Sequence, residues 1–247
     1  MLINIMIFIG ALSIGSFLNL IIYRVPRCES LLGPRSHCTL CRHALYPRDL
    51  IPVLSFVWLG GRCRYCKQVI KLRYLQVEII TALGYIAIYD KWGVSILSAI
   101  GWLFTALLII CAYTDVEEGI IPDLITYPGM VGGLVLSGCS IGIRSSIIGA
   151  LLLVGLFLLA ALLSQGGMGG GDIKLAGVIG AFLGWQGALS TLIISSLTGG
   201  IWAAGLLLQG RASRKTEVKF GPFLSSAAWV VWMYGEEISD FYWRVFF

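Results

Sequence analysis

Two aspartates far apart in the sequence are the first residues that suggest chemistry. Asp115 closes the apolar run WLFTALLIICAYTD, and Asp172 follows a glycine-rich stretch and opens the next apolar run. An ionisable residue at membrane depth is costly, so by default it indicates a functional site. Two carboxylates that converge in a poorly hydrated place can divide acid and base roles, because their mutual repulsion keeps one of them protonated. The pair therefore predicts an aspartic hydrolase site.

Four cysteines form a second chemical pattern, in which two C-x-x-C pairs are separated by 21 residues: Cys38, Cys41, Cys63 and Cys66. Four thiolates at this spacing can close a tetrahedral zinc site, and a full set of sulfur ligands gives the metal a structural role. The intervening segment has turn signals and one apolar, strand-like run. It is too short to hold a core alone, so we expect the metal to stabilise it. Reduced structural thiols or a redox pair are the alternatives.

The composition indicates the class of protein. Hydrophobic residues make up 57% of the 247 and charged residues only 13%, whereas a soluble domain has about 25% charged residues. Residues 24–75 carry ten basic side chains against two acidic ones, a net charge of +8 compared with +5 for the whole chain. A basic block directly after a first apolar segment is expected in the cytoplasm. Short basic loops beside membrane spans are common, so a nucleic-acid partner is not expected.

Hydropathy predicts an all-α polytopic membrane protein, because each membrane helix needs about 20 apolar residues. About eight transmembrane helices are expected, with a small cytoplasmic tetra-cysteine zinc module between the first and the second. The expected spans are 1–22, 73–89, 94–113, 120–139, 145–164, 173–186, 188–208 and 220–235. The predicted domains are a first helix at 1–23, the module at 24–72 and a membrane-embedded protease domain at 73–247.

The basic loops predict the orientation of these spans. With 24–72 and the basic loop 209–219 in the cytoplasm, Asp115 and Asp172 both lie at the cytoplasmic face. Asp172 stands at a helix start, where the dipole favours its anion or where it could simply be the N-cap. Asp115 stands at a helix end, where the dipole disfavours charge. The position of each aspartate in its own helix therefore predicts that Asp172 is the ionised base and that Asp115 is the proton carrier.

Three further features lie near the predicted site. Glycines at 166–171 allow the backbone to turn sharply and to approach a substrate closely. Asp123 follows Pro122 at a helix start, where a carboxylate suits the dipole, so we expect a structural role for it. Glu78, about one turn inside the second span, is expected either to pair with a neighbouring cation or to line the active cavity.

Seven segments in this order resemble the type IV prepilin peptidase family, the bacterial members of the GxGD aspartic membrane proteases. They are GSFLNLIIYRVP at 15–26, PRSHCTLC at 34–41, DLIPVLSFVWLGGRCRYC at 49–66, RYLQVEIITAL at 73–83, TDVEEGIIPD at 114–123, GMGGGDIK at 167–174 and FGP at 220–222. One departure is Gly170, where the family usually carries a bulkier, often aromatic residue.

The resemblance implies that Asp115 and Asp172 are the catalytic pair and that Gly169, Gly171 and Lys174 belong to the active-site loop. It implies cleavage of the basic leader of type IV prepilins or type II secretion pseudopilins at the cytoplasmic face of the bacterial inner membrane. It also implies N-methylation of the new N-terminus with S-adenosylmethionine. The other expected partners are membrane lipids, whose anionic headgroups would hold the basic module. The alternative is a polytopic transporter or channel that uses the aspartates as a cation site.

Overall fold

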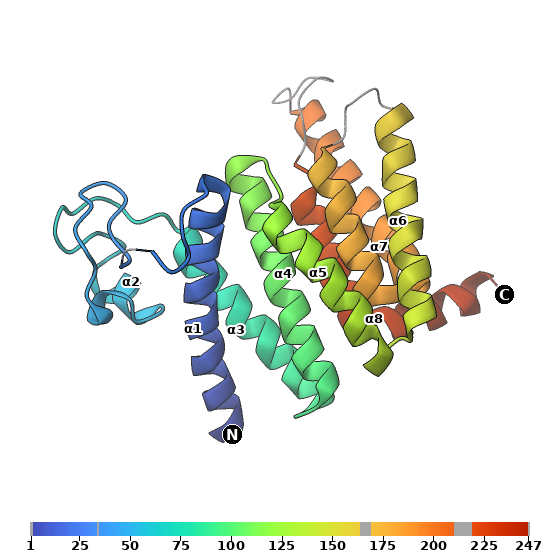
Figure 1. The fold of residues 1–247 in the computed structure, drawn as a ribbon, viewed down its shortest axis with the longest axis horizontal. Coiled ribbons are helices and arrows are strands. Elements are labelled where there is room, and N and C mark those ends of the chain that lie inside the picture. Colours follow the sequence, from blue (N-terminus) through green and yellow to red (C-terminus); the bar gives the residue numbers. More distant parts are fainter. Residues whose placement is uncertain (1, 34, 164–168, 210–218, 247) are drawn as a thin grey trace. The chain divides into compact units, whose positions relative to one another are not determined.

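The computed structural model describes the chain except residues 1, 34, 164–168, 210–218 and 247, and omits the side chains of 241–247. The described part is helical and contains no named strand (Figure 1). It forms two compact units, residues 1–110 and residues 111–247, which are described separately. These units are defined by internal packing, whereas the predicted domains were defined by composition and motifs. The predicted domain boundaries therefore remain a prediction.

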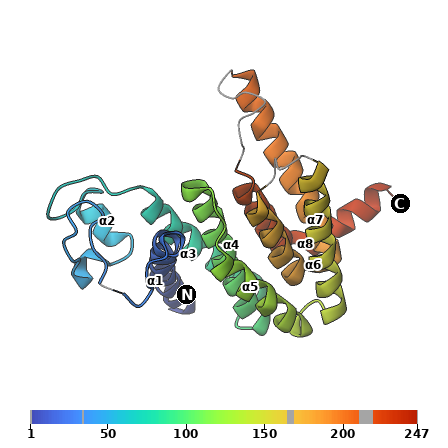
Figure 2. The same ribbon diagram turned by 45° about the horizontal axis from the view of Figure 1, so that its top comes forward.

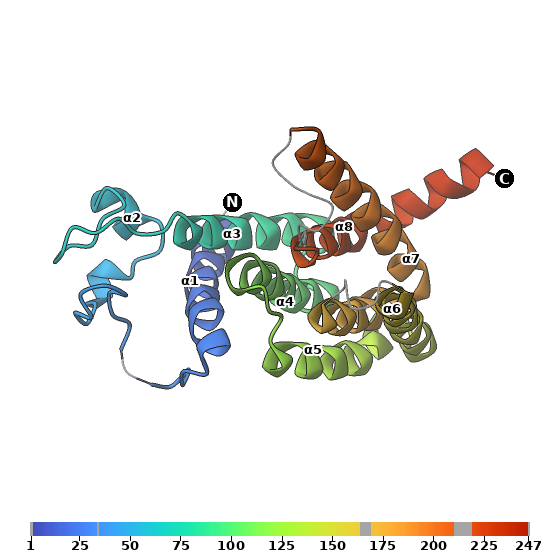
Figure 3. The same cartoon turned by 90° about the horizontal axis from the view of Figure 1, so that it is seen from above.

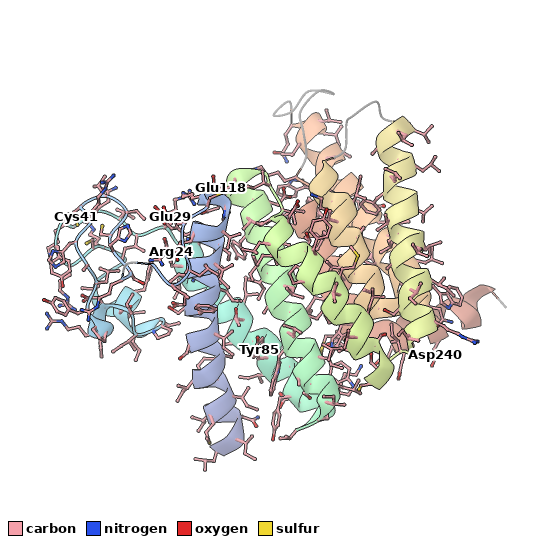
Figure 4. The ribbon with its side chains drawn as sticks, in the orientation of Figure 1. Arg24, Glu29, Cys41, Tyr85, Glu118 and Asp240 are labelled. Atoms are coloured by element: carbon pink, nitrogen blue, oxygen red, sulfur yellow. The ribbon has the colours of Figure 1, made fainter. Side chains whose placement is uncertain are left out.

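In the first unit, α1 (Leu2–Arg24) crosses α3 (Arg73–Trp92), as Figures 1 and 3 both show. Gly15 permits the crossing, because a Cβ at this position would lie 2.7 Å from the Cα of Glu78. A small core of Ala11, Ala82 and Tyr85 lies between the two helices. The indole of Trp102, from α4 (Ile96–Glu118), stacks on the Tyr85 ring and donates to its backbone carbonyl at 3.0 Å (Tyr85 is labelled in Figure 4).

The cysteine-bearing segment between α1 and α3 is mostly irregular, with the short helix α2 (Leu54–Trp58). The prediction of a strand-like run here is wrong. The chain makes a tight turn at Val53, where φ is +61° and the Leu54 amide bonds to the Pro52 carbonyl at 2.6 Å, and it continues as helix. This is the geometry of the rare γ-turn, which ends any extended run. The only bridges outside named strands among the described residues are His37–Ala44 and Arg62–Val69.

The second unit holds the end of α4, α5 (Asp123–Leu136), α6 (Ile143–Leu163), α7 (Gly170–Leu208) and α8 (Gly221–Phe246). Helices α6 and α7 lie side by side (Figures 1 and 2). Small residues let them approach closely, since a Cβ on Gly180 would lie 2.3 Å from the Gly149 carbonyl oxygen. The chain bends sharply at Gly184 (φ +68°), which divides α7 into two helical segments.

Four helical segments in the described part are long and apolar enough to cross a membrane: Leu2–Arg27, Ile96–Glu118, Ile143–Leu163 and Gly170–Leu208. The last of these contains two of the predicted spans, 173–186 and 188–208, and its bend at Gly184 lies close to their junction. Helices α3, α5 and α8 coincide with predicted spans but do not meet the same length and hydropathy criteria. The structure thus confirms an all-helical protein with apolar spans and leaves the count of eight as a prediction.

Candidate active site

The two aspartates line one pocket of the second unit, with a volume of about 260 Å³. Asp115 comes from the last turns of α4 and Asp172 from the first turn of α7. Glu118, which ends α4, is labelled in Figure 4. The pocket is lined by Asp115, Gly119, Ile120, Ile121, Gly169, Gly170, Gly171 and Asp172. The structure therefore brings together two carboxylates that the sequence separates widely.

Asp115 is buried, with 8% of its surface exposed, and its carboxylate has a backbone partner. The Gly221 amide donates to its Oδ2 at 3.0 Å. Gly221 is the first residue of α8, so this bond joins the beginning of one helix to the end of another. Next to it, Lys219 donates its Nζ proton to the Val116 carbonyl at 2.7 Å. The end of α4 is thus held by two contacts from the segment that enters α8, at Lys219 and at Gly221.

Asp172 does not cap α7, because Gly169 is the N-cap residue and Asp172 lies within the first turn. The Asp172 amide instead donates to the Gly169 carbonyl at 3.1 Å. The side chain therefore remains available to the pocket. Its Oδ1 is buried and has no hydrogen-bond partner among the described residues.

Glycines form the pocket wall beside Asp172. A Cβ on Gly171 would lie 3.0 Å from the Cβ of Ile121, so the chain passes closely over the loop between α4 and α5. A Cβ on Gly170, the position of the family departure, would meet nothing within 4 Å. Gly166, Gly167 and Met168, also part of the predicted glycine loop, lie outside the described residues.

Lys174, predicted as an active-site loop residue, does not line this pocket as the structure describes it. Its ammonium forms an ion pair with Asp123, the first residue of α5, and lies 5.5 Å from the centre of the Tyr127 ring. Both acidic and basic members are partly exposed, so the pair contributes little to stability. Its evident effect is to join the first turns of α5 and α7.

Glu78, predicted to pair with a cation or to line the cavity, lies in α3 of the first unit. Its Oε2 accepts the Val53 amide at 2.8 Å, and the Ser16 hydroxyl also bonds it. The carboxylate therefore anchors the strained turn at Val53 to α3. It connects the cysteine-bearing segment to the helix that follows it.

The four cysteines form one cluster in which all Sγ atoms lie within 4.8 Å of one another (Cys41 is labelled in Figure 4). The Cys38 and Cys66 Sγ atoms are 3.8 Å apart. A tetrahedral zinc ion with bonds of about 2.3 Å separates its sulfur ligands by about 3.8 Å. The donor type, the number of donors and this separation all fit structural zinc. His37 and His43 are not part of the cluster.

The two C-x-x-C pairs have the same backbone geometry, and we call residues 36–45 and 61–70 the twin knuckles. In each, the first cysteine amide bonds to the carbonyl five residues later, at 3.0 Å for Cys38 and 2.8 Å for Cys63. The residue after the second cysteine has positive φ in both, at Arg42 and Lys67. The same contacts recur 25 positions apart, which identifies a short internal repeat.

Asp49 joins the second of the twin knuckles to Tyr46, the residue that follows the first. Its carboxylate accepts the Arg64 Nε at 2.7 Å, the Tyr65 hydroxyl at 3.1 Å and the Tyr46 amide at 3.2 Å. Burial alone would raise the pKa of Asp49, but these donors outweigh it and hold that pKa below its ordinary value. The Tyr65 ring in turn packs on His43 of the other knuckle, with 3.7 Å between ring centres.

Comparison with known proteins identifies the family. The sequence profile of the bacterial peptidase A24 N-terminal domain matches residues 9–92, and that of the type IV leader peptidase family matches residues 102–204. The chain is 34% identical over 273 residues to the prepilin leader peptidase/N-methyltransferase of Aeromonas salmonicida (strain A449), with 96% of this chain and 92% of the relative covered. No solved structure matches the chain.

Proteins of the same name from two further bacteria are similar over most of their length. The relative from Bacillus subtilis (strain 168) is 33% identical over 242 residues, which cover 96% of each chain. The relative from Pseudomonas aeruginosa (strain PAO1) is 31% identical over 265 residues, covering 94% of this chain and 90% of the relative. An all-helical chain with apolar spans, paired carboxylates and a four-thiol cluster thus belongs to the type IV leader peptidase family, a family of proteases.

Reasoning from each aspartate's own helix missed one functional contact, the approach of Gly221 to Asp115. The two residues are 106 positions apart, so helix periodicity carries no information about their contact. The signal that could have found it is the FGP sequence at 220–222, a glycine and a proline at a helix start beside the predicted site.

Proposed function

We propose that this protein is an aspartic endopeptidase that removes the basic leader of type IV prepilins or type II secretion pseudopilins, with Asp115 and Asp172 as the catalytic pair. The observation that carries the proposal is that two carboxylates from separate helices line one pocket beside a glycine segment. A glycine wall leaves room for an extended backbone next to the carboxylates.

The chemistry follows general acid–base catalysis. The ionised aspartate takes a proton from a water molecule, whose oxygen bonds to the scissile carbonyl carbon. The protonated aspartate donates to the carbonyl oxygen. The carbon–nitrogen bond then breaks as the amine nitrogen takes up a proton, and the pair returns to one shared proton. The net reaction consumes one water and requires no covalent intermediate.

The location proposed for this reaction is the cytoplasmic face of the bacterial inner membrane. There the basic leader would remain in the cytoplasm while the apolar pilin segment lies in the bilayer. About eight spans, with the cysteine-bearing segment inside, would place both aspartates on that face. The net charge of +8 over residues 24–75 would repel a basic leader and attract anionic lipid headgroups, so we assign it to the membrane surface.

Two cofactors complete the proposal. Structural zinc would be held by the four clustered thiolates, where it would stabilise the segment between α1 and α3. The names of the relatives also suggest N-methylation of the new N-terminus, for which S-adenosylmethionine would be the methyl donor. The pocket and the cluster contain no feature specific to that donor in the described part of the chain, so no step is derived through it.

A leader-cleavage assay with purified protein in detergent tests the proposal, with a full-length type IV prepilin as substrate. Asp115→Asn and Asp172→Asn should each abolish cleavage and leave membrane insertion unchanged. Asp123→Asn is the matched control, because this aspartate lies outside the pocket, and it should keep substantial activity.

Cleavage at near wild-type rate by either of the first two variants would exclude the catalytic pair. The transporter or channel alternative predicts that the wild-type protein does not cleave at all.

A further inference from the structure

Lys219 and Gly221, where the chain enters α8, each contact the end of α4, beside the catalytic pair. The Gly221 amide reaches Asp115 Oδ2 at 3.0 Å, and Lys219 reaches the neighbouring Val116 carbonyl at 2.7 Å. The Lys219 ammonium also acts on Asp115 through its charge. Both contacts bring positive charge to one member of the pair only.

The Gly221 contact favours one protonation state of Asp115. A backbone amide can only donate, and the first amides of a helix have no intrahelical partner and carry partial positive charge. A hydrogen bond from such a donor is stronger when the acceptor is an anion. The geometry therefore stabilises Asp115 as a carboxylate, although Asp115 lies near the end of its own helix.

Asp172 has a different environment. Its buried Oδ1 finds no donor among the residues that the structure describes. A buried anionic oxygen without a donor is costly, and two like charges in one pocket disfavour double ionisation. The protonated carboxyl is the less costly state for Asp172 once Asp115 is ionised.

We infer that the segment from Lys219 into the first turn of α8 assigns the two catalytic roles. Gly221 and Lys219 are positioning residues that hold Asp115 as the general base, and Asp172 enters the reaction carrying the proton. This inference rests on the proposed function, and it reverses the roles expected from each aspartate's own helix. Asp115 accepts the proton of the attacking water, and Asp172 protonates the carbonyl oxygen. Asp115 then passes its proton to the leaving amine, and the newly formed carboxylic product returns one to Asp172.

Glycine is required at 221 for this contact. A Cβ there would lie 2.7 Å from Asp115 Oδ2 and 3.1 Å from its Cγ. Gly221→Ala should therefore displace the carboxylate and lower kcat roughly 100-fold, with KM nearly unchanged. Gly205→Ala in α7 is the matched control, because a Cβ there meets nothing within 4 Å, and it should keep wild-type kcat. A kcat for Gly221→Ala within twofold of the control would overturn the positioning role.

The pH dependence of kcat/KM tests the electrostatic part. Besides Lys219, the titratable groups that interact with the charge of Asp115 in the described part of the chain are Asp172 and Cys111. The acidic limb of the profile reports the group that must be ionised in the free enzyme. Lys219→Gln should move this limb to higher pH, and Lys219→Arg should restore the wild-type profile. A uniform loss at all pH values, with the limb unmoved in Lys219→Gln, would contradict the inference.

Infrared difference spectra give a readout that does not need turnover. The Asp172→Asn and Asp115→Asn proteins, each minus the Asp115→Asn/Asp172→Asn double variant, isolate the carboxyl signals of Asp115 and Asp172, respectively. In a pH titration, a protonated-carboxyl band that disappears at lower pH for Asp115 than for Asp172 supports the inference, and an equal or reversed order overturns it. If the cleavage assay instead shows that the single Asn variants are active, the proposed function fails, whatever the spectra show.

Discussion

At the scale of single residues, Asp49 shows how a buried charge can organise a segment with little regular structure. Only 2% of its side chain is exposed, and three donors from two parts of the segment converge on it. A buried carboxylate is costly unless hydrogen bonds compensate it. Because its pKa is lowered in the folded state, its contribution is complete above the ordinary aspartate pKa and is lost only as the pH falls through the lower value.

Asp49→Ala should therefore destabilise the cysteine-bearing segment at neutral pH, by about 2 kcal/mol, since it removes hydrogen bonds to a charged group. Limited proteolysis within residues 24–72 measures the effect as a faster cleavage rate. Glu29→Ala is the control, because Glu29 lies exposed in the same segment (labelled in Figure 4). Equal proteolysis of the two variants would show that Asp49 does not organise the segment.

The sequence allowed the candidate site residues to be predicted more readily than their partners. The types of Asp115, Asp172 and the four cysteines, with the apolar runs around them, were enough to predict a pocket and a cluster. Apart from the Ser16 hydroxyl, the partners of Glu78 and Asp115 are backbone amides, which every residue except proline has. Sequence patterns therefore do not single out such partners, and only the tertiary approach of Val53 and Gly221 does.

At the scale of helices, the close approach between α6 and α7 depends on glycines. A Cβ on Gly180 would lie within 2.4 Å of two backbone atoms of Gly149, and backbone cannot move aside as a side chain can. Hydropathy predicted both helices but not their contact. A glycine lowers the mean hydropathy of an apolar run only slightly, so the pattern does not mark the glycines at which the helices meet. The position of the bend at Gly184 could be predicted more nearly, since two predicted spans, 173–186 and 188–208, meet close to it.

Gly180→Ala should force α6 and α7 apart and destabilise the second unit by about 1–3 kcal/mol, the usual cost of overpacking. The thermal midpoint in detergent should fall accordingly. Gly155→Ala in α6 provides the comparison, because a Cβ there meets nothing within 4 Å and alanine is the better helix former. A midpoint for Gly180→Ala at or above that of Gly155→Ala would contradict the packing argument.

At the scale of the whole molecule, the chain combines apolar helices with a basic segment that has almost no hydrophobic core. The helices are expected to be stable in a bilayer because their backbone groups are paired internally. The described residues between α1 and α3 have only α2, two single-turn 3-10 helices at Val25–Arg27 and Pro47–Asp49, and two isolated bridges as regular structure, so the stability of this segment depends on the thiol cluster and on Asp49. Loss of metal should therefore affect one part of the protein and leave the rest inserted.

The purified protein should contain about one zinc per chain. Cys41→Ser should lose the metal and expose residues 24–72 to protease, while the helices remain inserted. Cys139→Ser is the control, because this exposed cysteine is not part of the cluster, and it should keep the metal. Elemental analysis with protease mapping checks both statements. A metal-free wild-type protein whose segment resists protease would exclude the zinc assignment.

The repeated geometry of the twin knuckles has a consequence for how metal binds. Each half supplies two thiolates, and two ligands alone cannot satisfy a tetrahedral ion. Neither half has a hydrophobic core of its own, so one half is not expected to be folded until the other half also binds the ion. Capture of the ion and closure of the two halves should then be a single all-or-none event. A titration of the apo-protein would show strong cooperativity, with no populated state in which one half is ordered and the other is not.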